Sequence, residues 1–308
     1  MNIANELPKV SKETTSAVTI GVFDGVHRGH VHLISELSKR AKAEKRSSIV
    51  LTFKLHPSHV LDPNFEPCYL TTLEERLRLL RQLAVDEVVP VTFDIDLSRL
   101  KARAFVELLQ TQLGMRELVV GPDFAMGHRR EGDVATLRNL GKDMGFGVSV
   151  VEPLTEESRV IGSTAIRAAL TDGNLETAAK LLGRNFSLPG TVVHGSGRGK
   201  GLGFPTANLR PTEGLIVPGD GIYAAWGHVE AGRHMAATSI GTNPTFEDKT
   251  RTIEPFLLDF NGDLYDKPLK LEFVRRLRDQ VKYEKVEDLQ RQVDEDVDQT
   301  KKALRARN

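Results

Sequence analysis

Apolar and polar positions in the first half of the chain follow two alternating patterns. Short apolar runs are each followed by a longer segment whose apolar positions recur at helical spacing. The runs span 18–23, 47–53, 85–93, 116–121 and 146–154, and helices are predicted from about residue 30 and over 73–83, 98–113 and 133–144. This strand–helix alternation predicts a doubly wound α/β domain, a parallel sheet with helices on both faces.

Residues suited to helix ends support these limits. Thr72 and Glu75 form a capping-box pattern before the second helix, and Ser98 is predicted to cap the third. Gly114 and Gly145 stand where the third and fourth helices are expected to end.

The pattern changes in the second half of the chain. Two short helices are predicted over 163–170 and 175–182. From 186 to 272 come short strands separated by Gly and Pro clusters, which is typical of an antiparallel barrel or sandwich. The stripe of Val286, Leu289, Val293 and Val297 predicts a final amphipathic helix. We therefore expect two domains, 1–184 and 185–308.

Composition narrows the class of protein. The chain of 308 residues suits two domains, and 42 basic against 42 acidic residues give no charge excess that would favour nucleic acid or an anionic membrane. Cys68 is the only cysteine, so no internal disulfide can form. The first residues lack the apolar core of a signal peptide, and no apolar run approaches the ~20 residues that span a bilayer. We expect a soluble, cytoplasmic protein.

The segment from Ala17 to Leu37 carries the first candidate chemistry. An apolar strand ends in a turn that presents His27 and His30 around Gly29, at the start of a helix. Unpaired N–H groups at a helix N-terminus attract anions, and imidazoles add hydrogen-bond donors. This arrangement predicts a phosphate site. The histidines could instead be ordinary surface residues, and a zinc site with His32 would lack a carboxylate or cysteine at a supporting spacing.

Two further segments of the first half are candidates for ligand binding. Residues 120–133 follow a strand and are rich in Gly and charge, so they are either a binding loop or a simple connection. Ser163 and Thr164 begin a helix with Arg167 one turn later. This set could clamp phosphate oxygens, or the hydroxyls could act only as helix caps.

In the second half, residues 194–209 are dense in glycine. Gly201 follows Lys200 where a Walker motif requires Ser or Thr, yet backbone N–H groups with Arg198 and Lys200 could still wrap phosphates. Thr206 and Asn208 offer neutral oxygens that, with nucleotide phosphates, could complete a Mg²⁺ site. A flexible hairpin is the alternative interpretation.

Glu254 stands in a strand-like apolar run. A carboxylate buried there without a partner would be costly. It is therefore either exposed on an edge strand or a general base that accepts a hydroxyl proton.

Taken together, these segments resemble the bacterial bifunctional riboflavin kinase/FMN adenylyltransferase family, also called FAD synthetases. The first half carries GVFDGVHRGH, TFKLHP, VGPDF-x-x-G-x-x-R-x-GD and STAIR in the family's order. The second half carries GRGKGLGFPTANL, PGDGIYA, SIGTNPTF, TIEPFLLDF and GDLY. Each motif is weak alone, but nine in order over nearly the whole chain are specific.

The resemblance implies two reactions. A C-terminal β-barrel would transfer the ATP γ-phosphoryl group to riboflavin, with Glu254 as base, Thr206 and Asn208 as Mg²⁺ ligands, and the phosphate loop Gly197, Arg198, Gly199 and Lys200. An N-terminal nucleotidyltransferase domain would then adenylylate FMN to FAD and release pyrophosphate. There His27, Gly29 and His30 would bind phosphate, Ser163, Thr164 and Arg167 would clamp the leaving pyrophosphate, and Asp123 and Phe124 would meet the flavin.

Four residues depart from the family pattern. Leu55 replaces a usual proline, Met126 a phenylalanine, Gly162 a serine and Asp266 a glycine. Two alternatives therefore accompany the bifunctional prediction: a riboflavin kinase with a degenerate adenylyltransferase module, and a non-catalytic flavin- or nucleotide-binding protein. A transferase acting on another phosphate compound would leave the second half unexplained. The sequence does not predict the oligomeric state.

Overall fold

The computed structural model describes residues 3–9, 14–194, 204, 206–243 and 248–305. By its internal contacts the chain divides into two compact units. The first comprises Met1–Pro67 and Thr72–Gly162, and the second comprises Cys68–Thr71 and Ser163–Asn308.

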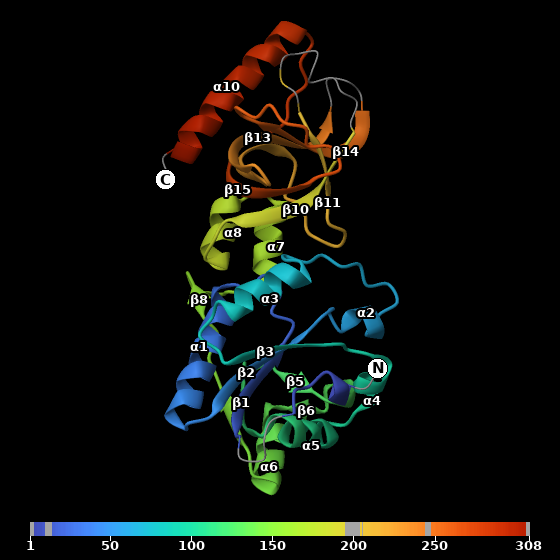
Figure 1. Cartoon of the computed structure of the whole chain (residues 1–308), viewed down its shortest axis with the longest axis vertical. Coiled ribbons are helices and arrows are strands. Elements are labelled where there is room, and N and C mark those ends of the chain that lie inside the picture. The colour runs from blue at the N-terminus through green and yellow to red at the C-terminus, as the bar shows by residue number, and fades with distance from the viewer. Residues whose placement is uncertain (1–2, 10–13, 195–203, 205, 244–247, 306–308) are drawn as a thin grey trace. The chain divides into compact units, whose positions relative to one another are not determined.

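The first unit is an α/β domain built on a five-stranded sheet, as the sequence predicts (Figure 1). Its sheet has the order β3-β2-β1-β4-β7, and every pairing in it is parallel. In chain order the elements are β1 (Ser16–Gly21), α1 (Arg28–Ala43), β2 (Ser47–Phe53), α2 (Ser58–Leu61), α3 (Leu73–Arg81), β3 (Glu87–Val91), α4 (Ile95–Arg99), α5 (Ala102–Leu113), β4 (Met115–Val120), β5 (Ala125–Met126), β6 (Gly132–Asp133), α6 (Val134–Met144), β7 (Gly147–Val150), β8 (Thr155–Glu156) and β9 (Arg159–Val160).

Both faces of this sheet are buried. On one face Val18 of β1 joins a core with Leu109 of α5 and Leu137 of α6. On the other face Ala17 of the same strand packs in a core with Leu37 of α1 and Leu80 of α3. Because successive strand residues point to opposite faces, two covered faces require the continuous apolar runs seen in the sequence.

One predicted helix is wrong in its limits. The segment 98–113 is not a single helix capped by Ser98, because α4 ends at Arg99 and α5 begins at Ala102. Asp94 caps α4, with its Oδ1 accepting a hydrogen bond from the Leu97 N–H at 2.9 Å. Ser98 lies inside α4 and donates to the Ile95 carbonyl. Leu100 adopts an extended ψ of 129°, which breaks the helical path.

In its described residues the second unit contains two helices, a six-stranded antiparallel barrel and a C-terminal helix, so the sequence-based prediction of a barrel with a final helix is confirmed. Its elements are α7 (Ser163–Thr171), α8 (Leu175–Leu182), β10 (Phe186–Val193), β11 (Asn208–Pro211), β12 (Gly221–Val229), β13 (Gly232–Asn243), β14 (Asp248–Leu257), β15 (Pro268–Arg278) and α10 (Val286–Arg305). The strand order is β11-β10-β15-β12-β13-β14. Next to β11, the Ala207 N–H donates to the Pro255 carbonyl of β14 at 2.9 Å, so the sheet nearly closes.

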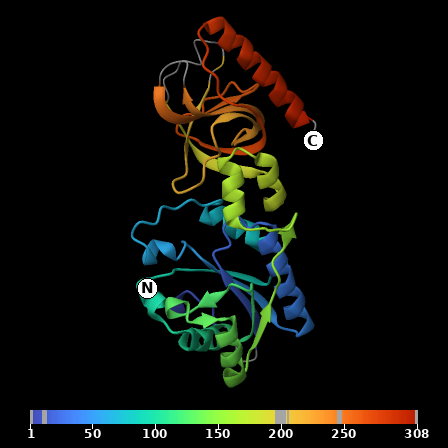
Figure 2. The same ribbon diagram turned by 180° about the vertical axis from the view of Figure 1, so that it is seen from behind.

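Helix α10 lies along the outside of the barrel (Figure 2). Its Leu304 is fully buried with Ala224 and Trp226 of β12 and Val274 of β15. Inside the barrel, Phe273 stacks on Phe186 with ring centroids 6.2 Å apart. No helix in the part of the chain that the structure describes is long and apolar enough to cross a membrane.

A buried ion pair ties α10 to the barrel. Asp296 receives two hydrogen bonds from the Arg278 guanidinium, Nε to Oδ1 at 2.8 Å and Nη2 to Oδ2 at 2.6 Å. Only 5% of the Asp296 side chain is exposed. Loss of one partner would leave the other charge buried and uncompensated.

We therefore predict that Asp296→Ala lowers the free energy of unfolding of the second unit by about 3–5 kcal/mol. The exposed Asp298 lies on the same helix, and Asp298→Ala should change stability by no more than ~0.5 kcal/mol. Urea denaturation followed by tryptophan fluorescence reports on Trp226, the only tryptophan. Equal effects of the two substitutions would contradict a stabilising role for the pair.

Candidate functional sites

A cavity opens at the carboxyl ends of the parallel strands in the first unit. Its volume is about 710 Å³, and its lining comes from the residues that follow or end β1, β2, β3 and β4. The strand order reverses direction between β1 and β4, and ligands of doubly wound sheets bind in the crevice at such a point. The fold thus places a ligand-sized space where this class of domain normally has its site.

Four phenylalanines are among the residues that line this cavity. Phe53 and Phe93 meet edge to face with ring centroids 5.4 Å apart, and Phe124, predicted to meet the flavin, also lines the space. Such surfaces suit a flat, largely apolar ring system. Asp123 is exposed and does not line the cavity, and its backbone carbonyl accepts a hydrogen bond from Arg130 Nη2 at 3.0 Å.

The turn from β1 to α1 brings the two predicted phosphate-binding histidines together. His27 is the N-cap of α1, which begins two residues earlier than the pattern indicates, and its Nδ1 accepts a hydrogen bond from the His30 N–H at 3.3 Å. The two rings stack with centroids 3.6 Å apart. Phe23 and Val26 have positive φ angles of 54° and 39°. For a β-branched residue such as Val26 this conformation is strained, and strain of this kind concentrates at functional sites.

Gly29 is required by close packing in this turn. A Cβ atom there would lie 2.9 Å from the Ile161 carbonyl oxygen and 3.1 Å from the His27 ring. Any side chain at this position would therefore displace the histidine that caps the helix.

His30 is neutral at physiological pH. Burial lowers the pKa of its imidazole well below the ordinary value of 6.5, and the neighbouring charges of His27 and Arg76 lower it further. Its Nδ1 atom is buried and has no hydrogen-bond partner among the described residues. The guanidinium of Arg76 is itself buried and donates to the carbonyls of Phe53 and Lys54 at 2.8 and 2.7 Å. The turn thus offers an anion a helix N-terminus, a nearby positive charge and an unsatisfied imidazole nitrogen.

The lowered pKa of His30 predicts a pH dependence of stability. In the unfolded chain this imidazole takes up a proton as the pH falls through about 6.5, whereas in the folded protein it stays neutral. Stability is therefore complete above that pH and falls by up to ~1.4 kcal/mol per pH unit below it. We predict that His30→Gln makes the decline of unfolding free energy between pH 7 and pH 5 shallower. Denaturant titrations at several pH values measure it, and an unchanged slope would show that His30 is not buried in its neutral form.

The predicted pyrophosphate clamp lies on α7 of the second unit. Ser163 begins this helix, Thr164 is exposed, and Arg167 follows Ser163 by one turn on the same face. The Arg167 Nε donates to the Cys68 carbonyl at 2.6 Å, which fixes the guanidinium on the helix surface.

The barrel brings Thr206 and Glu254 together. The Thr206 hydroxyl lies 3.5 Å from Glu254 Oε2, and the Thr252 hydroxyl lies 2.9 Å from Oε1. Asn208 begins β11, two residues after Thr206. All these side chains are partly buried. Gly197, Arg198, Gly199 and Lys200 lie outside the described residues.

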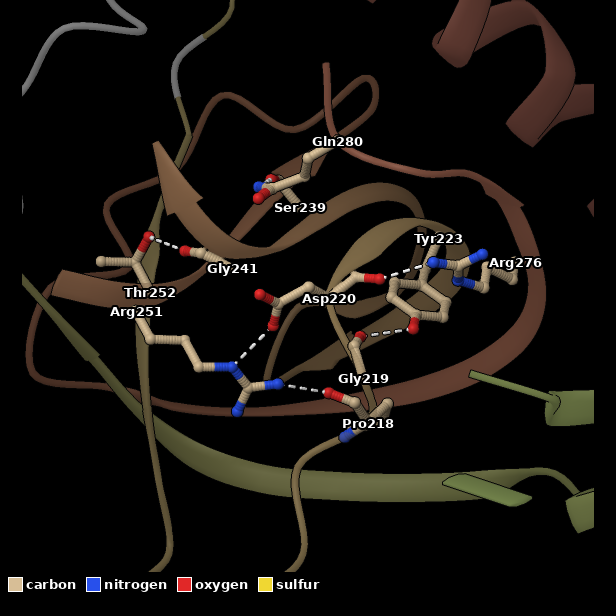
Figure 3. A network of polar contacts seen from close by, with 10 residues as sticks. All are labelled: Pro218, Gly219, Asp220, Tyr223, Ser239, Gly241, Arg251, Thr252, Arg276 and Gln280. Atoms are coloured by element: carbon tan, nitrogen blue, oxygen red, sulfur yellow. Dashed lines mark hydrogen bonds and ion pairs between the residues drawn. The ribbon is translucent and has the colours of Figure 1, made fainter. Parts of the chain in front are cut away.

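A set of side-chain donors fixes the segment that precedes β12, beside the strand that carries Glu254 (Figure 3). Arg251 Nη2 donates to the Pro218 carbonyl at 2.6 Å, Tyr223 to Gly219 at 2.5 Å, and Arg276 to Asp220 at 2.7 Å. Arg251 Nε also bonds the Asp220 carboxylate at 2.7 Å. We call residues 218–220 the clamped segment, because three consecutive carbonyls each accept a side-chain hydrogen bond.

Comparison with family models decides the family. The FAD synthetase model matches residues 9–165, and the riboflavin kinase model matches residues 182–304. The chain belongs to the bifunctional riboflavin kinase/FMN adenylyltransferase family. The predicted resemblance is thereby confirmed.

Individual relatives agree over nearly full length. The bifunctional riboflavin kinase/FMN adenylyltransferase of Listeria monocytogenes is 36% identical over 291 residues, covering 94% of this chain and 92% of that protein. The Escherichia coli K12 protein of the same name is 35% identical, covering 91% and 90%. A crystal structure described as a macrolide-efflux protein from Streptococcus pneumoniae matches with a TM-score of 0.86 and 30% identity, over 98% and 97% of the two chains.

The structure accounts for one of the four departures from the family pattern. Asp266 has a φ of +59°, a left-handed conformation that glycine adopts freely and that Asp tolerates better than most residues. A Cβ atom at Gly162 would have no neighbour within 4 Å, so the missing side chain reflects no steric limit. Met126 is buried and lines the cavity, while Leu55 is exposed.

Sequence reasoning missed several residues that the fold places at these sites. Phe53 and Phe93 end or follow strands, and the rule that parallel strands deliver their carboxyl ends to one edge could have identified them. In the sequence, Arg76 is one of several charged residues on an amphipathic helix, and no local pattern predicts that it is buried. Thr252 precedes Glu254 by two residues, the spacing that puts both on one face of a strand.

Proposed function

We propose that this protein makes FAD in two steps. Its barrel phosphorylates riboflavin with ATP to give FMN, and its α/β domain joins FMN to the adenylyl group of ATP with release of pyrophosphate. The observation that carries the proposal is that one chain holds both family domains. It is supported by the stacked histidines at a helix N-terminus and by the contacts of Glu254 with two threonine hydroxyls.

In the kinase reaction we assign Glu254 as the general base. Its carboxylate accepts the proton of the riboflavin 5′-hydroxyl as that oxygen attacks the γ-phosphorus of ATP, and ADP leaves. Thr206 and Asn208 carry hard oxygen atoms of the kind that Mg²⁺ prefers, and Thr206 lies beside the base. They would hold Mg²⁺ together with nucleotide phosphates, and the ion would neutralise charge on the transferring group. The loop Gly197, Arg198, Gly199 and Lys200 is assigned to the ATP phosphates.

In the adenylyltransferase reaction the residues mainly position and neutralise. An FMN phosphate oxygen attacks the α-phosphorus of ATP while the bond to pyrophosphate breaks. His27, Gly29 and His30 with the α1 N-terminus are assigned to the ATP phosphates, and Ser163, Thr164 and Arg167 to the leaving pyrophosphate. Phe124 and the other cavity aromatics would hold the flavin ring, with Asp123 in the adjoining loop.

We assign the adenylyltransferase domain to 1–184 and the riboflavin kinase domain to 185–308. The two family models leave residues 166–181 unmatched between them. These residues lie in α7, in α8 and in the turn that joins them, and by internal contacts they group with the barrel. We further propose that the protein acts in the cytoplasm, where ATP and free flavins are available and a lone thiol stays reduced.

Incubation of the pure protein with riboflavin, ATP and Mg²⁺ tests the whole proposal. Chromatography should show FMN first and FAD following it. FMN that accumulates without FAD would indicate a kinase with an inactive adenylyltransferase module. Bound but unconverted riboflavin would indicate a flavin carrier.

Two substitutions should separate the reactions. Glu254→Gln should lower FMN formation by about 10²–10⁴-fold, because the general base is lost, while FAD formation from supplied FMN continues. His30→Ala should do the reverse. Rates of both half-reactions, measured on each variant, check this. Loss of both activities in either folded variant would contradict the two-site assignment.

The aromatic cavity yields a separate prediction. Phe93→Ala removes a ring that packs against Phe53 in the lining. It should raise the KM for FMN in adenylylation by about 10-fold, equivalent to ~1.4 kcal/mol of lost aromatic contact. Riboflavin phosphorylation is the internal control and should keep its KM. An unchanged KM for FMN would place the flavin elsewhere.

A further inference from the structure

We propose that Thr252 is a positioning residue that orients the Glu254 carboxylate for proton abstraction. The proposal rests on the assignment of Glu254 as the base. Both residues lie on β14, and their i, i+2 spacing puts them on the same face of the strand. The Thr252 hydroxyl donates to Glu254 Oε1 at 2.9 Å, a normal length for such a bond.

The two carboxylate oxygens have different neighbours. Oε1 faces Thr252, while Oε2 faces Thr206, the candidate Mg²⁺ ligand, at a longer distance of 3.5 Å. A hydrogen bond to an ionised group is stronger than one between neutral groups. The bond from Thr252 therefore fixes the rotation of the carboxylate and leaves Oε2 on the side of the predicted metal and substrate.

Thr252 has a second acceptor within reach. Its hydroxyl lies 3.4 Å from the Gly241 carbonyl of the neighbouring strand β13 (Figure 3). A hydroxyl carries one proton, so it can donate fully to only one of the two acceptors. While Glu254 is ionised, the Thr252 hydroxyl donates its hydrogen bond to the carboxylate, which is the nearer of the two acceptors. Once Glu254 has received the proton of the substrate hydroxyl, the Thr252 hydroxyl can turn to Gly241, so neither state leaves it unsatisfied.

Side-chain hydrogen bonds with other parts of the barrel fix the backbone around Thr252. Its neighbour Arg251 bonds the clamped segment at Pro218 and Asp220. On the opposite strand, Gln280 Nε2 donates to the hydroxyl of Ser239, the register partner of Glu254, at 2.9 Å. These contacts fix the backbone on both sides of the Thr252–Glu254 pair, as expected where a base must be preorganised.

The test compares kinase kinetics of three variants. Thr252→Val keeps the shape of the side chain and removes the hydroxyl, and it should lower kcat for riboflavin phosphorylation by about 10- to 100-fold, the range for one hydrogen bond to a charged group. The KM values for riboflavin and ATP should stay within about 3-fold, since the contact acts on the base. Thr252→Ser should restore kcat to near the wild-type value.

Thr238→Val is the matched control. Thr238 is fully buried on β13 opposite Pro255, and its hydroxyl has no hydrogen-bond partner among the described residues. The same substitution should leave kcat unchanged. Thermal melting and FMN adenylylation of every variant monitor folding. If Thr252→Val does not fold, Thr252→Ala is compared with Thr252→Ser in its place.

Three results would overturn the proposal: kcat of Thr252→Val within 2-fold of wild type, a loss confined to KM, or an equal loss in Thr238→Val.

The variant Glu254→Gln distinguishes failure of the positioning role from failure of the proposed function. If Glu254→Gln keeps the wild-type kcat, Glu254 is not the base and the kinase mechanism itself is wrong. If it loses activity while Thr252→Val does not, only the positioning role fails. In the Glu254→Gln background, Thr252→Val should have no additional effect on the residual rate.

Discussion

The parallel arrangement of β1, β2, β3 and β4 is the constraint on which the first site depends. Parallel strands deliver all their carboxyl ends to one edge, so residues far apart in sequence, such as Phe53 and Phe124, line one cavity. The same geometry starts α1 after the carboxyl end of β1, with His27 as its N-cap. Val26, next to the N-cap His27, has a positive φ angle, which is a strained conformation for a β-branched residue.

In the barrel, residues that are far apart in the sequence come together because the sheet nearly closes on itself. Thr206 and Glu254 are 48 residues apart, yet they meet because the segment before β11 reaches the edge of β14. Near-closure covers a strand edge that would otherwise be open to aggregation, and it creates a rim where the Glu254 carboxylate and the Thr206 hydroxyl face each other. The clamped segment braces this rim through side chains of three different strands.

Much of this could be predicted from the sequence, and the failures have physical reasons. The five-stranded sheet and the barrel could be predicted from period and turn residues, because both faces of the sheet are buried and Gly and Pro clusters separate the barrel strands. The helix over 98–113 was mispredicted because Ser98 is an acceptable cap, and only the tertiary path at Leu100 favours Asp94 instead. Motifs select His27, His30 and Glu254 as candidates, whereas Arg76 and Phe93 join the candidate sites only through long-range packing.

The neutral state of His30 determines how the proposed adenylyltransferase site would act. A cluster of fixed positive charges would hold ATP and pyrophosphate with similar strength, and tight ground-state binding does not accelerate the reaction. Here the turn offers backbone N–H groups, an imidazole kept uncharged by burial, and Arg76 already bonded to two carbonyls. In the proposed phosphate site, such donors would stabilise charge that develops on the leaving pyrophosphate while limiting the net attraction for the product. The Nδ1 atom of His30, which has no hydrogen-bond partner among the described residues, is the atom where the proposed site would express that difference.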